Sequence, residues 1–114
     1  MLTKKQILIL FLISGDPGIK GIYSLVNFFD RADFPSNMRE NINALLSKGF
    51  IIILEKFDNG TEKSYQITEQ GKELLRSNFS ISEILQYIET MNDSALILEI
   101  TKSYIDKTQE VYRN

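Results

Sequence analysis

The side chains with the clearest binding chemistry lie in a polar stretch that begins at residue 36. Arg39 can form a bidentate hydrogen bond with guanine, and Asn37 or Asn43 can do so with adenine. Ser36, together with the N-terminus of a helix, can hold a phosphate. The alternative is that these residues only face water, because Arg39 and Asn43 are spaced as i,i+4 neighbours on one exposed side of a helix. The polar residues expected to face outward are Ser36, Asn37, Arg39, Glu40, Asn41 and Asn43.

Basic residues elsewhere in the chain can supply contacts with phosphate groups. Those outside the polar stretch and the expected hairpin are Lys4, Lys5, Lys20, Arg31 and Lys48. Lys56 and Lys63 are expected to oppose each other across a hairpin, where they either face an anion or extend into water. We favour water, because exposed lysines are usually only solvated. The charged residues of this hairpin sum to −1, so we do not expect it to clamp phosphate strongly.

The acidic residues invite an enzymatic interpretation. Asp30 with Asp33, or Glu55 with Asp58, can in principle act as an acid and a base. However, 15 acidic residues in a small protein produce such spacings by chance, and the chain has no histidine and no cysteine. No glycine-rich phosphate loop or nucleophile motif accompanies them. We therefore expect a protein that is not an enzyme, with no catalytic residue, no metal site and no cofactor.

Composition indicates an ordinary globular chain. The 114 residues are 43% hydrophobic and 25% charged, with a net charge of −2. This charge disfavours an indiscriminately basic nucleic-acid binder, but the acidity is concentrated in the second half. Residues 1–63 carry eight Lys or Arg against seven Asp or Glu, whereas residues 64–114 carry five against eight.

The apolar run Ile7–Ile13 follows Lys4 and Lys5, as in the start of a secretory signal peptide. No small-x-small cleavage site follows it, and seven residues are too few to span a bilayer. We expect a buried first helix over residues 3–14, no membrane association and a cytoplasmic location.

Hydrophobic spacing predicts further helices over residues 19–30 and 36–48, the latter with a capping box from Asn37 to Glu40 and a stop at Gly49. Two short strands, 51–54 and 63–67, are expected to form a hairpin around a two-residue Asn59-Gly60 turn. Counting outward from this turn pairs Ile52 with Ile67 and Leu54 with Tyr65 on the inward face.

After the hairpin, Thr68 is expected to cap a helix over residues 69–77, and a second capping box opens another helix at Ser80. A break at residues 92–94 precedes a last helix that runs to about Tyr112. The predicted fold class is therefore mainly α with a small β-hairpin, in the α+β class.

Two stretches of sequence resemble bacterial transcription regulators of the multiple-antibiotic-resistance (MarR) and phenolic-acid-decarboxylase (PadR) families. The first is Asn43-Ala-Leu-Leu-Ser-Lys-Gly-Phe-Ile51, and the second, more specific, is Tyr65-Gln-Ile-Thr-Glu-Gln-Gly-Lys-Glu-Leu-Leu75. The likeness covers roughly residues 2–77. It implies a winged helix-turn-helix domain over residues 1–78, with an additional helical extension over residues 79–114.

By this resemblance, the helix at residues 36–48 would lie in the major groove of double-stranded DNA. The chain would then be a homodimeric transcriptional regulator. A winged helix that binds protein rather than DNA is the alternative, since one fold serves both purposes. The sequence identifies neither an operator nor a small-molecule effector.

The C-terminal extension carries more apolar residues than a small core is expected to need. We expect these residues to pair with a second copy of the chain. The residues expected at that dimer interface are Ile97, Ile100, Tyr104, Ile105 and Val111. A tail that folds onto its own first helix is the alternative.

Overall fold

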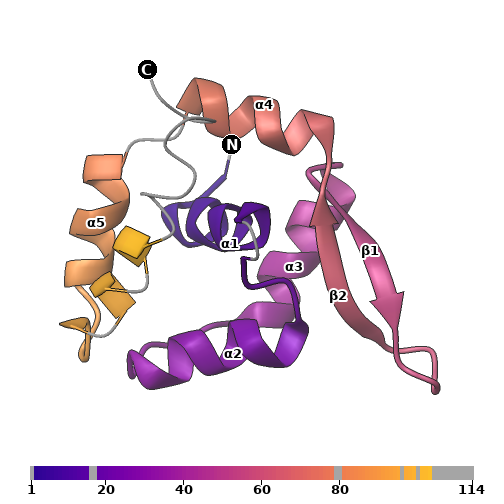
Figure 1. Ribbon diagram of the computed structural model, residues 1–114, viewed down its shortest axis with the longest axis horizontal. Helices are drawn as coiled ribbons and strands as arrows, with labels where there is room; N and C mark the ends of the chain where they lie inside the picture. The colour runs from indigo at the N-terminus through magenta and orange to yellow at the C-terminus, as the bar shows by residue number, and fades with distance from the viewer. Residues whose placement is uncertain (1, 16–17, 79–80, 96, 100, 104–114) are drawn as a thin grey trace.

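The computed structural model describes residues 2–15, 18–78, 81–95, 97–99 and 101–103. The fold is mostly helical with one two-stranded antiparallel sheet, which confirms the predicted α+β class. In chain order the elements are α1 (Lys4–Ser14), α2 (Ile22–Arg31), α3 (Met38–Ser47), β1 (Ile51–Lys56), β2 (Glu62–Ile67), α4 (Glu69–Asn78) and α5 (Ile81–Glu89). The hairpin lies at one end of the molecule and α5 at the other (Figure 1). Among the described residues, no helix is long and apolar enough to cross a membrane.

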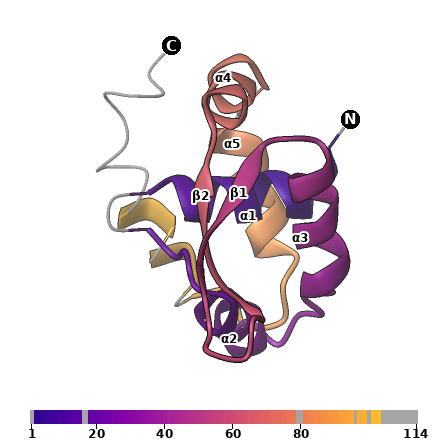
Figure 2. The same cartoon turned by 90° about the vertical axis from the view of Figure 1, so that its right-hand side faces the viewer.

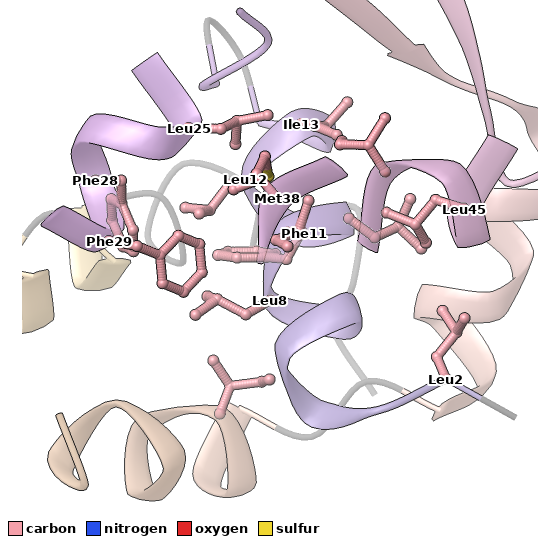
Figure 3. Close-up of a cluster of buried hydrophobic side chains, with 14 of the residues drawn as sticks. Leu2, Leu8, Phe11, Leu12, Ile13, Leu25, Phe28, Phe29, Met38 and Leu45 are labelled. Carbon is pink, nitrogen blue, oxygen red and sulfur yellow. The ribbon is translucent and has the colours of Figure 1, made fainter. Parts of the chain in front are cut away.

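Helix α1 is the centre of the fold, as its apolar sequence predicts. All residues from Leu8 to Ile13 are buried, because α3, α4, α5 and β2 all pack against this helix. Figure 3 shows side chains of α2 on one side of α1 and Leu45 of α3 on the other. The helix begins with a complete capping box, in which the Gln6 amide donates to Thr3 Oγ1 and the Thr3 amide donates to Gln6 Oε1.

Helix α2 begins three residues later than expected, because the backbone at Lys20 and Gly21 bonds to β2 before the helix starts. The Tyr65 amide donates to the Lys20 carbonyl at 3.0 Å, and Gly21 forms a bridge with Ser64. The Lys20 ammonium group donates to the carbonyls of Ile13 and Gly15 at the end of α1. Lys20 was expected among the residues that contact phosphate, but its ammonium group is held by the end of α1. Its charge stabilises the negative end of the α1 dipole.

The hairpin is present, but its predicted register is wrong by one residue. Ile51 pairs with Ile67 and Ile53 with Tyr65. The reason is the turn: the Gly60 amide donates to the Phe57 carbonyl at 2.9 Å, and Gly60 has a φ of 87°. These are the features of a three-residue loop closed by a left-handed glycine, instead of the expected two-residue turn.

This shift exchanges the two faces of β1, since side chains alternate along a strand. Ile51 is buried and Ile53 packs against the core. Ile52 and Leu54, which were expected to face inward, are 52% and 50% exposed.

Helix α4 docks closely on the residue that precedes β1. Thr68 Oγ1 accepts the Gly71 amide, which confirms the predicted cap. A Cβ added at Gly71 would clash with the Phe50 carbonyl oxygen and would lie 2.7 Å from Ile67 Cγ1. Glycine is required at position 71 because the helix lies so close to Phe50 and Ile67 that no side chain fits there.

The described part of the C-terminal extension packs on its own chain. Ile84, Ile88, Met91 and Ile97 are buried in the same hydrophobic cluster as α1. The Asp93 amide also donates to the Ala32 carbonyl at the end of α2. The expectation that Ile97 supplies a dimer interface is therefore wrong for this arrangement, because its side chain is fully buried within one chain. Ile100, Tyr104, Ile105 and Val111 lie outside the described residues.

Candidate nucleic-acid interface

Helix α3 presents one polar face to solvent and one apolar face to α1. Met38, Ile42 and Leu45 are buried, whereas Arg39, Glu40, Asn43 and Ser47 are exposed at a spacing of three and four residues. This spacing places the exposed residues on one ridge of the helix. Figure 2 shows helix α3 beside the hairpin.

The N-terminus of α3 differs from the expected capping box. Asn37 occupies the N-cap position with a φ of 45°, and its side chain makes no capping hydrogen bond to the described residues. Its left-handed backbone does not have the extended geometry on which side-chain capping depends. Asn37 and Glu40 are exposed, and Ser36 is half-buried.

Asn41 was expected to face outward, and this was wrong. Its side chain is on the inner face with Met38 and Leu45, which precede and follow it by three and four residues, and the residue is only 8% exposed. Gln6 Nε2 donates to Asn41 Oδ1 at 3.1 Å, and Asn41 Nδ2 donates to the carbonyls of Ser36 and Asn37. Asn41 therefore joins α3 to α1 and is not positioned for a ligand.

Arg39 is exposed but engaged by the hairpin. Its Nη1 lies 2.8 Å from Glu62 Oε1, and the Tyr65 hydroxyl donates to the same oxygen at 2.7 Å. The hydrogen bonds from Arg39 and Tyr65 hold the pKa of Glu62 below its usual value. Burial, and then the bond to Glu62, raises the pKa of Tyr65 to about 12. We call these three residues the Arg39–Glu62–Tyr65 chain.

Sequence reasoning missed Glu62 as a partner of Arg39. The two residues are 23 positions apart, and only the packing of β2 beside α3 brings them together. No local spacing signals such a pair. Glu62 also takes the place that was expected for Lys63, because the shifted register pairs it with Lys56. Lys63 instead lies over the Phe57 ring, with Nζ 5.7 Å from the ring centre.

The N-terminus of α1 brings two further cations close to the start of α3. One shallow depression is lined by Thr3, Lys4, Lys5, Asn37, Glu40, Asn41 and Tyr87. Lys5 donates to the Pro35 carbonyl and lies over the Phe34 ring, and burial lowers its pKa. Lys4 is exposed. Lys4 and Asn37 line the same depression, so a phosphate bound beside Asn37 would lie near Lys4.

The structure does not bring the remaining expected cations to this depression. Arg31 is exposed at the end of α2, and Lys48 is exposed at the C-cap of α3, at the opposite end of that helix from Asn37. Lys20 is occupied by the end of α1. The candidate interface consists of the α3 ridge, the hairpin and Lys4, with Lys48 at its far edge.

Within the described residues, no group of three or more Asp, Glu, His or Cys side chains is arranged to hold a metal ion. Comparison with protein-family models, with curated proteins and with solved structures finds no match for this chain.

Replacing Tyr65 by Phe should reduce the loss of stability at alkaline pH. A raised tyrosine pKa means that the folded state favours the protonated form. The stabilisation from Tyr65 is therefore fully present below about pH 10, the pKa of tyrosine in the unfolded chain. It is then lost as pH rises towards about 12. Urea denaturation should therefore show a smaller decrease in the free energy of unfolding above about pH 10 for the variant than for the natural protein. Tyr23→Phe, at an exposed position, is the control and should retain the decrease of the natural protein.

Proposed function

We propose that this protein is a winged-helix transcriptional regulator that binds double-stranded DNA with α3 in the major groove. The observation that carries the proposal is the polar ridge of α3, with Arg39 and Asn43 exposed beside a hairpin that can lie along the sugar-phosphate backbone. Arginine and asparagine are the side chains that most directly read guanine and adenine.

The arrangement of elements supports the winged-helix part of this proposal. Three helices precede the hairpin, and Gly21, between the first two helices, forms an isolated antiparallel bridge with Ser64 of β2. A regulator of this kind would work in the cytoplasm, where it meets chromosomal DNA. Lys4 and Lys48, near opposite ends of α3, are the cations best placed to contact phosphates on either side of the groove.

Assembly as a homodimer is part of the proposal, since two copies would read two half-sites one helical turn apart. Ile84, Ile88, Met91 and Ile97 of the extension pack in the core of one chain, so the proposed dimer does not depend on them. Sedimentation equilibrium of the full chain should show a dimer, and a monomer mass at micromolar concentration would remove this part.

The DNA proposal is tested by selecting bound duplexes from a random library and measuring their affinity by fluorescence anisotropy. We expect log K to fall linearly with log salt, because phosphate contacts release counterions. Arg39→Ala should weaken binding to the selected duplex by about 1–3 kcal/mol. Arg76→Ala is the matched control, because it removes an exposed arginine, paired with Glu73, from α4. A chain that enriches no duplex at low salt does not have the proposed function.

A protein-binding role is the second candidate, and the exposed apolar residues of β1 favour it. Ile52 and Leu54 both face solvent on the hairpin, where a DNA-binding wing would usually carry basic residues. If Ile52→Ser and Leu54→Ser leave DNA affinity unchanged, these side chains are not part of a DNA contact.

A further inference from the structure

The Arg39–Glu62–Tyr65 chain holds an exposed arginine from the side of the hairpin. Tyr65 is fully buried, so its ring is fixed in the core while its hydroxyl donates to Glu62 Oε1. The same oxygen accepts Arg39 Nη1, whose side chain is 54% exposed. An arginine side chain ordinarily loses rotamer entropy when it binds a ligand. Here part of that cost is already met by folding.

We infer that Glu62, oriented by Tyr65, positions the guanidinium of Arg39 to bind one guanine base rather than the DNA backbone. The inference rests on the proposed function, and it names the ligand group that this part of the interface selects. Arg39 is the reading residue, and Glu62 and Tyr65 are positioning residues.

Hydrogen-bond capacity allows this role. A guanidinium group carries five N–H donors, and one nitrogen of Arg39, Nη1, donates to Glu62. A bidentate bond to the O6 and N7 atoms of guanine needs two N–H groups. Arg39 can therefore hold Glu62 and guanine at the same time.

Charge favours a base edge over a phosphate as the partner of Arg39. The carboxylate of Glu62 neutralises Arg39 at 2.8 Å, and a phosphate at the same position would be repelled by that carboxylate. Guanine O6 and N7 are neutral acceptors and are not repelled in this way. Glu62 thus lowers sequence-independent attraction at Arg39 while it leaves base recognition intact.

The location of Arg39 supports the same partner. It is the second residue of α3 and lies one turn before Asn43 on the exposed ridge. In a helix that enters the major groove, the outward residues of the first turns are the ones that reach base edges.

The inference is tested on the selected duplex by replacing its guanines one at a time with 7-deazaguanine, which lacks the N7 acceptor. 7-Deazaguanine keeps O6 and removes one of the two acceptors of the bidentate pair. The natural chain should therefore lose affinity at one guanine by about 5-fold or more, but by less than the upper limit of about 150-fold for the whole pair. For the Arg39→Ala variant, 7-deazaguanine at that position should cause little further loss of affinity. Glu62→Gln and Tyr65→Phe should each reduce the 7-deazaguanine penalty at least threefold, while affinity for a random duplex is retained or increased.

Glu55→Gln is the matched control. It removes one carboxylate from the same hairpin, where Glu55 accepts a hydrogen bond from Ser64. This variant should keep the full 7-deazaguanine penalty. Thermal denaturation of each variant shows whether the chain is folded, and Tyr65→Phe carries the test if Glu62→Gln is not.

Two results separate the inference from the proposed function. If the natural chain enriches no duplex, both are wrong. If it binds a duplex and Arg39 reads a guanine, but the folded Glu62→Gln and Tyr65→Phe variants keep the full penalty, the positioning role is wrong and DNA binding stands.

Discussion

Replacing Ile51 by Asp should abolish cooperative folding. Ile51 is buried in β1 and pairs with Ile67, so the substitution would place an unpaired carboxylate in the hydrophobic core. A buried charge without a partner costs more than about 4 kcal/mol, a large part of the roughly 5–15 kcal/mol that stabilises a typical domain. Circular dichroism during urea denaturation should show no cooperative transition for this variant.

Ile52→Asp is the matched control, one residue further along the same strand. Ile52 is half-exposed, so the new carboxylate stays in water, and we expect a change of about 1 kcal/mol or less. This pair of variants distinguishes the two registers of the hairpin. If Ile52→Asp unfolds the protein and Ile51→Asp does not, the three-residue turn at Asp58–Gly60 is wrong.

Phe11→Ala should destabilise the protein by about 3–5 kcal/mol, as truncation of a buried phenylalanine usually does. Phe11 is fully buried on α1, which is packed by helices and by the sheet on all sides, so its neighbours have little freedom to fill the cavity. The measurement is the free energy of unfolding from urea denaturation.

Tyr23→Ala provides the comparison for Phe11→Ala. It also truncates an aromatic side chain on a helix, but Tyr23 is 73% exposed and its described ring contact is with Phe57. The loss should be limited to that contact, about 0.5–1.5 kcal/mol. Equal losses for the two variants would contradict the placement of α1 at the centre of the fold.

The candidate site could be anticipated only as a list of residue types. The polar residues at positions 39, 40 and 43 were recognisable as one helix face, because the apolar residues that alternate with them define the opposite face. The residue type of Asn41 does not predict that it lies on the inner, apolar face. Its burial depends on Gln6 of α1, which satisfies its side-chain carbonyl at a separation of 35 residues.

The hairpin shows how a local choice has a wide effect. The sequence indicated two strands and a turn at Asn59-Gly60, and both are present. However, Asn-Gly is compatible with a two-residue loop and with a three-residue loop that ends in a left-handed glycine. The difference of one residue decided which face of β1 is buried, because successive side chains of a strand point to opposite faces.

Local sequence therefore determined the elements of this protein: the apolar run of α1, the cap at Thr3, the amphipathic face of α3, and the caps at Gly49 and Thr68. Each depends on residues within about one or two helical turns, where propensity and spacing are sufficient. Tertiary structure alone decided the pairing of Arg39 with Glu62 and the burial of Ile97. These depend on contacts between segments that are distant in sequence, whose geometry is set by how whole elements pack.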